Sequence, residues 1–182
     1  PKFNTFADVA IAAEKVLNID IESSVINCRR AMEFAIKWMY SVDKSLEMPY
    51  QDNLISLMST DDFHNLVDDG LWKRLDLIRK IGNRAAHNGK KVSMDEAMLC
   101  LQNLFIFMDF VSYCYADSYT ERTYDVSLLQ KAQAQYNLAW CLWHGLGVQP
   151  EPEKAAYWGK LAAEQQFPPA VEFMANLSRP EE

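Results

Sequence analysis

The chain has 182 residues, of which 49% are hydrophobic and 12% aromatic, so it can bury a real core and does not have the composition of a disordered protein. Its formal net charge is -7, which argues against non-specific coating of nucleic acid or of acidic membranes by the protein as a whole. Any contact with nucleic acid must therefore be local, and no membrane partner is expected.

The cysteines predict a reduced, cytoplasmic protein without a disulfide framework or a structural metal. They form no Cys-x-x-Cys pair, and no histidine lies at zinc-finger spacing beside them. The first residues, PKFNTFADVA, lack the basic region and long apolar run of a secretory signal. The apolar stretch near residues 104–115 is interrupted by Asp109 and is too short to span a bilayer. No glycine-rich phosphate loop or nucleophile elbow is present, so we expect no cofactor.

Helical periodicity dominates the sequence, and period-two alternation is nearly absent, which predicts an all-α fold. We expect helices over residues 5–17 and 22–42, near 54–58, after Thr60, over 71–87 and from Ser93 to about 115. Thr60 is a suitable N-cap, and Ser93 with Glu96 forms a capping box. The helix over 71–87 should bury a stripe of five residues and stop at Asn88 and Gly89. That stripe consists of Leu71, Leu75, Ile78, Gly82 and Ala85.

The segment from residue 71 to residue 91, LWKRLDLIRKIGNRAAHNGKK, carries an unusual concentration of positive charge and is called the basic segment below. Its seven basic residues and one acid, Asp76, give 7 − 1 = +6, whereas the remaining chain has 11 basic and 24 acidic residues, or −13. The basic residues are Lys73, Arg74, Arg79, Lys80, Arg84, Lys90 and Lys91. We therefore predict that the basic segment binds nucleic acid or an acidic protein partner.

Three polar residues of the basic segment, Arg79, Asn83 and His87, follow one another at intervals of four and share roughly 80° of one helix face. Cleavage of RNA without a metal needs a base for the 2′-hydroxyl and a cation for the phosphorane, and His87 and Arg79 have this chemistry. Asn83 could orient the imidazole or the phosphate. The alternative is structural: His87 would satisfy the carbonyls at the helix end, and Gly82 would allow close helix packing.

The first part of the chain resembles a known family through three segments that occur in this order: RRAMEFAIKWMY (29–40), PYQDNLISLM (49–58) and LWKRLDLIRKIGNRAAH (71–87). They are similar to the helical domain of unknown function found near the N-terminus of type I restriction helicase subunits, which looks related to the HEPN superfamily. The resemblance implies a helical bundle and, in HEPN ribonucleases, an arginine and a histidine paired across a homodimer. It would place Arg79 and His87 in those roles, but the seven residues between them exceed the usual HEPN gap.

The last part of the chain resembles a Sel-one-like repeat, a relative of the tetratricopeptide repeat, through AQYNLAWCLWHGLGVQPEPEKAAYWGKLAAEQQFPPA. Ala134 and Ala170 lie 36 positions apart and look like the same position of successive units. Gly145 and Gly147 would allow the tight turn between its helices, whereas Ala139 and Gln166 stand where the family usually has glycine. The resemblance implies a helix–turn–helix unit that binds proteins and does not catalyse a reaction. Candidate anchors for a protein partner are Trp140, Trp143 and Tyr157.

We therefore expect three parts: a HEPN-related helical domain over 1–117, a connector over 118–125 and the repeat over 126–182. The leading hypothesis is a non-catalytic adaptor of a bacterial defence or nucleic-acid-processing system. In it, the repeat binds a protein and the basic segment binds RNA, DNA or an acidic partner. The competing hypothesis is a metal-independent ribonuclease of the HEPN type, which acts as a homodimer through Arg79, Asn83 and His87. In a third reading, the basic segment serves only an acidic protein partner.

Overall fold

The computed structural model describes residues 3–87 and 91–177, with the side chains of 126–130 left out. No strand occurs in this part of the chain, so the predicted all-α fold is confirmed. The chain divides into two compact units, Pro1–Tyr124 and Asp125–Glu182, called unit 1 and unit 2 below. Each unit is described by itself.

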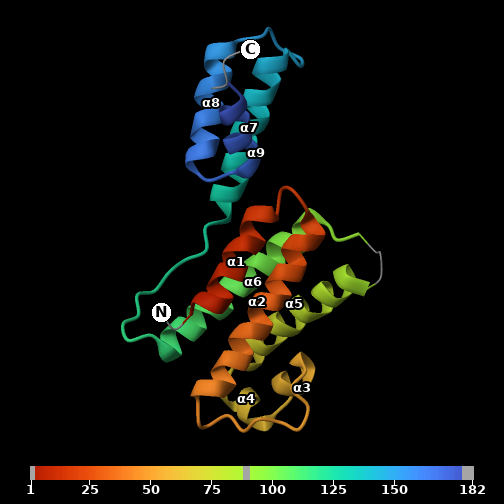
Figure 1. Ribbon diagram of the computed structural model, residues 1–182, viewed down its shortest axis with the longest axis vertical. Helices are drawn as coiled ribbons and strands as arrows, with labels where there is room; N and C mark the ends of the chain where they lie inside the picture. The colour runs from red at the N-terminus through yellow and green to blue at the C-terminus, as the bar shows by residue number, and fades with distance from the viewer. Residues whose placement is uncertain (1–2, 88–90, 178–182) are drawn as a thin grey trace. The chain divides into compact units, whose positions relative to one another are not determined.

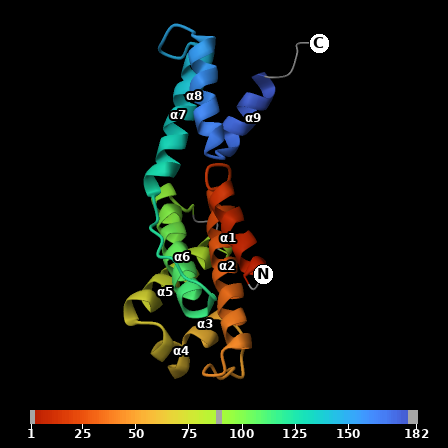
Figure 2. The same cartoon turned by 90° about the vertical axis from the view of Figure 1, so that its left-hand side faces the viewer.

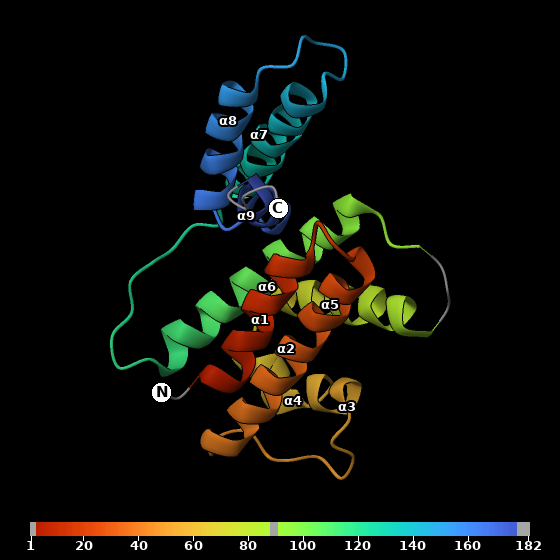
Figure 3. The same cartoon turned by 45° about the horizontal axis from the view of Figure 1, so that its top comes forward.

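Unit 1 is a helical bundle in which α2 packs against α1, α5 and α6 (Figure 1). Two short helices, α3 and α4, lie at the end of the bundle where α2 ends, as Figures 1 and 3 both show. The elements are α1 (Asn4–Val16), α2 (Ile21–Val42), α3 (Leu54–Met58), α4 (Asp61–Leu66), α5 (Asp69–His87) and α6 (Met94–Tyr115). The predicted helices are thus present, with bounds that differ by one or two residues.

Side-chain caps fix where several of these helices begin. The Thr60 side chain accepts a hydrogen bond from the Phe63 amide at 3.2 Å, as the sequence predicted for α4. Ser93 and Glu96 form the predicted capping box of α6, in which each side chain accepts from the other residue's backbone amide. Such caps satisfy amides that have no partner inside the helix, so polar residues at these positions define the helix starts.

Helix α6 is the apolar centre of unit 1. In the described part of the chain, it is the one helix that is long and apolar enough to cross a membrane. The stretch at 104–115 was judged too short from the sequence, but the helix that contains it begins at Met94. Seven of its residues are buried, and it packs against α2 and α5. Burial within the bundle accounts for part of its apolar composition, since 39% of its most apolar window is buried.

Helix α5 places one face in the core and leaves its last turn open. Leu71, Leu75, Ile78, Ile81 and Gly82 are buried. Ala85 was predicted to continue this stripe, and that prediction is wrong: Ala85 is half-buried. The exposure of α5 increases toward its end, where Ala86 and His87 are exposed.

Unit 2 contains α7 (Val126–His144), α8 (Pro152–Glu164) and α9 (Pro168–Leu177). Figure 2 shows α7 and α8 side by side, and α8 also packs against α9. The predicted helix–turn–helix is present as α7 and α8, and α9 is a third helix that was not predicted. In the core of unit 2, Ala170 of α9 is packed with Ala132, Ala162 and Phe167. Helix α9 therefore packs on the pair formed by α7 and α8, as the start of a second helical unit.

The turns of unit 2 use the left-handed backbone conformation, as the repeat pattern predicts. Gly145 and Gly147 have φ angles of 67° and 76° between α7 and α8. Gln166, between α8 and α9, has a φ angle of 59°. A residue with a Cβ atom is disfavoured in this conformation, which explains why glycine is usual at the position that Gln166 occupies.

Candidate functional site

The predicted site lies on α5, whose first turn is fixed by Asp68. The Asp68 carboxylate accepts a hydrogen bond from the Leu71 amide at 2.6 Å, so it supplies a partner for the start of the helix. The first turn contains Asp69, and the last turn contains Arg84 and His87. This distribution of charge complements the helix dipole, which favours anions at the start and cations at the end.

Asp76 is a buried carboxylate on α5 that binds two of the predicted site residues. Arg79 donates to Asp76 Oδ1 from Nε at 2.9 Å and from a terminal nitrogen at 2.6 Å. Lys80 Nζ lies 2.7 Å from Asp76 Oδ2. Burial raises the pKa of Asp76, but the bonds from Lys80 and Arg79 outweigh it and hold this pKa below the ordinary value. The carboxylate is therefore charged at neutral pH and neutralises much of the charge beside it.

Three other basic residues of the segment, Lys73, Arg74 and Arg84, also have partners within unit 1. Lys73 pairs with Asp69 at 2.6 Å on the surface. Arg84 pairs with Glu96, and its hydrogen bond is the main reason why the pKa of Glu96 is lowered.

Arg74 donates to Asn103 Oδ1 at 2.9 Å. Lys91 is exposed, and Lys90 lies outside the described residues. The count of +6 thus overstates the free positive charge, because it left out Asp69 and Glu96, which lie just outside the segment.

Among the described residues, no side-chain hydrogen bond or ion pair joins the three residues predicted for catalysis. Arg79 is 20% exposed at its side chain and directs two donors to Asp76. Asn83 is half-buried and His87 is exposed. Within one chain, the arrangement supplies the Arg79 cation, which is held by the Asp76 carboxylate, and, separately, His87, which is open to solvent.

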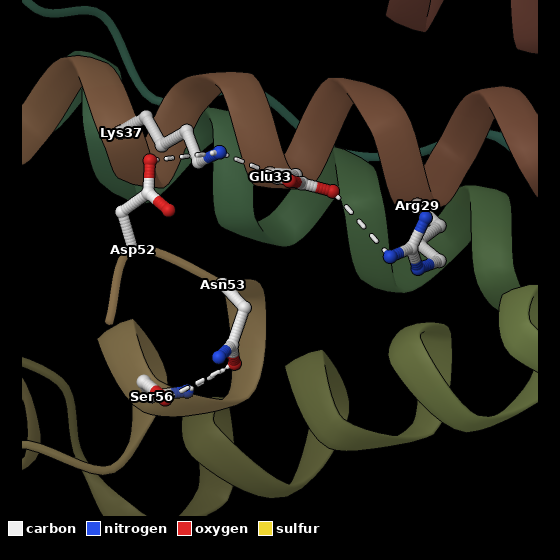
Figure 4. A network of polar contacts seen from close by, with 6 residues as sticks. All are labelled: Arg29, Glu33, Lys37, Asp52, Asn53 and Ser56. Carbon is white, nitrogen blue, oxygen red and sulfur yellow. Dashed lines mark hydrogen bonds and ion pairs between the residues drawn. The ribbon is translucent and has the colours of Figure 1, made fainter.

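The sequence analysis missed a polar network on α2 that lies beside the basic segment (Figure 4). Glu33 is flanked by Arg29 at 3.5 Å and Lys37 at 3.2 Å, and Lys37 extends to Asp52 at 3.9 Å. The Arg29 stem packs over Gly82 of α5: a Cβ atom added to Gly82 would lie 2.6 Å from Arg29 Cβ. The i, i+4 spacing on α2 could have predicted the pairs of Glu33 with Arg29 and Lys37 from the sequence. Nothing in the sequence indicated that Arg29 packs on Gly82.

The aromatic residues predicted as partner anchors are partly exposed on unit 2. The exposed fractions are 41% for Trp140, 39% for Trp143 and 59% for Tyr157. Both tryptophan rings contact Phe173 of α9, with ring centroids 6.2 Å and 6.0 Å away. Tyr157 meets Trp158 edge-on at 5.3 Å. The structure therefore holds these rings against neighbours and leaves part of each open to solvent.

Metal and cofactor sites are not evident in the residues that the structure describes. No group of three or more His, Cys, Asp or Glu side chains there could hold a metal ion. The thiols of Cys28 and Cys100 are buried, and burial raises the pKa of each above its usual value, for Cys100 to about 12. These two cysteines are therefore inert as nucleophiles at neutral pH.

Two family models match the chain. The model described as Domain of unknown function (DUF4145) matches residues 11–136, and the model described as Sel1 repeat matches residues 132–167. The second match confirms the predicted Sel1-like repeat, which spans most of α7, all of α8 and the residues up to Phe167. No curated protein and no solved structure matches the chain.

Proposed function

We propose that this chain, which belongs to the family described as Domain of unknown function (DUF4145), is a non-catalytic interaction protein whose Sel1 repeat binds another protein. A Sel1 repeat is generally a protein–protein interaction motif. The observation that carries the proposal is the partial exposure of Trp140, Trp143 and Tyr157 on that repeat. Aromatic side chains of this kind concentrate at the centres of protein interfaces.

The two tryptophans of α7 are suited to anchor a partner because their positions are already restricted. Each ring contacts Phe173, and Trp140 also lies against His144, with ring centroids 4.1 Å apart. Side chains that are ordered before binding lose less conformational entropy when the partner arrives. Leu146, in the turn after α7, is also exposed and adds apolar surface beyond the tryptophans.

A test begins with capture of partners on the full chain and continues with the purified partner in a direct binding measurement. Trp140→Ser and Trp143→Ser should each raise the Kd at least about tenfold, which is the weakening typical of a central aromatic residue. Tyr50→Ser is the matched control, since Tyr50 is a fully exposed aromatic residue of unit 1. An unchanged Kd in both tryptophan variants, with the fold retained by circular dichroism, would place the interface elsewhere.

A second contact is proposed at the basic face of α5, with RNA, DNA or an acidic protein. The exposed residues Lys73, Arg74, Lys80 and Lys91 support it, although two of them already pair with acids. Affinity for nucleic acid at this face should fall steeply as salt rises. If neither RNA nor DNA binds at low salt, an acidic protein is the ligand of this face. A role in the cytoplasm, within a bacterial defence or nucleic-acid-processing system, belongs to the same proposal.

The competing function, a HEPN-type ribonuclease, would need a different arrangement of the α5 residues. Arg79 would have to leave Asp76, or else bind phosphate while paired, and His87 would have to meet an Arg79 of a second copy. Incubation with labelled RNA in EDTA, beside Arg79→Ala and His87→Ala variants, distinguishes the two functions. Cleavage by the parent that both variants lose would replace the adaptor proposal, whereas three equally inactive proteins support it.

A further inference from the structure

A cavity of about 430 Å³ lies in unit 1 between the start of α5 and the second half of α6. Its volume is within the range of small-ligand sites, and it is open to solvent. Asp68 and Arg74 line it from the α5 side, Asp109, Phe110 and Tyr113 line it from α6, and Tyr119 closes it from the segment that follows α6. Neither the family match nor the proposed function assigns a role to this cavity.

Tyr119 forms a fixed aromatic wall of the cavity. Its hydroxyl donates a hydrogen bond to Asp109 Oδ2 at 2.7 Å, and its ring meets Tyr113 edge-on with centroids 5.3 Å apart. The hydrogen bond to Asp109 raises the pKa of Tyr119 to about 12, so the hydroxyl stays protonated at neutral pH and acts as the donor. Tyr113 is 67% exposed, and its ring is therefore accessible to a ligand in the cavity.

The charges that line the cavity favour a cation. Two carboxylates, Asp68 and Asp109, face one guanidinium, Arg74, which already donates to Asn103. A phosphate would meet this excess of negative charge. A metal ion is disfavoured because the cavity lining supplies only two carboxylates, and no group of three or more His, Cys, Asp or Glu side chains in the described residues could hold one. The combination of aromatic rings with carboxylates is the one that organic cations prefer.

We propose that this cavity binds the guanidinium group of an arginine side chain presented by a protein partner. The planar guanidinium stacks on the exposed ring of Tyr113, to which the Tyr119 ring is nearly perpendicular, and forms a charge-assisted contact with Asp109, which a lysine ammonium makes with less stacking. The site lies within unit 1, and its ligand is tested separately from the partner proposed for the Sel1 repeat.

The test titrates Nα-acetyl-arginine amide into the full chain while the tyrosine ring signals are followed by NMR. We expect saturable shifts at Tyr113 and Tyr119, and binding at least about fivefold weaker for the neutral citrulline analogue, which keeps the shape and loses the charge. Asp109→Asn keeps an acceptor for Tyr119 and removes the charge, and Tyr113→Leu removes a ring. Each should weaken binding at least about threefold. Tyr50→Leu, which changes a tyrosine outside the cavity, should leave it unchanged.

Four outcomes would overturn the proposal. The first is an absence of saturable shifts at Tyr113 and Tyr119. The second is equal binding of the arginine and citrulline compounds, which would show that the cavity recognises shape without charge. The third is binding of inorganic phosphate that Arg74→Gln abolishes, which would make the cavity an anion site. Stronger binding of the lysine amide would keep a cation site but reject the guanidinium as its ligand.

Discussion

Gly82 allows α5 to approach α2, and its replacement by alanine tests that contact directly. A Cβ atom at Gly82 would lie 2.6 Å from Arg29 Cβ and 2.8 Å from Arg29 Cδ. Ordinary contacts between carbon atoms are about 3.5–4.0 Å, so about 1 Å of relief is needed. The Cδ atom can move with the side chain, but the Cβ atom is fixed to the α2 backbone, and relief therefore requires the helices to separate.

The expected free-energy changes have opposite signs in two backgrounds. In the parent, the gain of about 1 kcal/mol that alanine brings to a helix offsets only part of the steric cost of about 1–3 kcal/mol, so Gly82→Ala should lower the free energy of unfolding by up to about 2 kcal/mol. In an Arg29→Gly background the clash is gone, and the same change should raise the free energy of unfolding by about 1 kcal/mol. In an Arg29→Ala background the Cβ contact remains, so the change should still destabilise unit 1.

The assay is urea unfolding of the full chain, followed through NMR amide signals of α2 and α5, which report unit 1 alone. A double-mutant cycle then isolates the coupling between positions 29 and 82. The reasoning is refuted if Gly82→Ala has the same effect in the parent and in the Arg29→Gly background. It is also refuted if Arg29→Ala relieves the cost as fully as Arg29→Gly does, because the Cβ contact would then not be the cause.

Three further predictions concern Asp76, Gln166 and Gly147. Asp76→Asn should lower the free energy of unfolding by about 1–3 kcal/mol, since Arg79 and Lys80 lose a buried charged partner, whereas the exposed control Asp69→Asn should cost less than about 0.5 kcal/mol. Because the pKa of Asp76 is lowered in the folded state, the difference in the free energy of unfolding between the parent and Asp76→Asn should be full above about pH 5 and should shrink as the pH falls further. A difference that stays constant in urea titrations from pH 7 to pH 2 would contradict this. Gln166→Gly should raise the melting temperature of unit 2 by relieving about 1 kcal/mol of left-handed strain, and Glu164→Gly, within α8, should lower it. Gly147→Ala should lower the same melting temperature through backbone strain alone, because nothing lies within 4 Å of the added Cβ; Gly145→Ala should lower it further, since its Cβ would lie 2.9 Å from Pro150.

Much of the fold was predictable because its signals are local. Thr60 and the Ser93–Glu96 pair define helix starts through bonds that span three residues, and the structure has both. The glycines at 145 and 147 predicted a tight turn, and both have positive φ angles. The third helix of unit 2 was missed because its reason is tertiary: Ala170 is buried against α7 and α8 residues that lie far from it in the sequence.

The candidate site was less predictable because its charges are paired at several sequence distances. The pairing of Asp76 with Arg79 and Lys80 has ordinary helical spacing, and a count of charges alone overlooked it. Arg84 and Glu96 lie on different helices, and Arg74 meets Asn103 across 29 positions. The exposure of Trp140 and Trp143 also depends on how α9 packs, since Phe173 contacts both rings.

These contacts explain why the segment IRKIGNRAAH is a poor guide to activity, although the first resemblance rests on it. Arg79 neutralises a buried carboxylate, Gly82 accommodates the stem of Arg29, and Arg84 joins α5 to the start of α6. Each of these roles would restrict the residue at its position even in a protein that cleaves nothing. Likeness in this segment therefore indicates the helical bundle first, and any activity must be sought at residues that the bundle does not require. His87 and Lys91, both exposed, and the cavity closed by Tyr119 are such places.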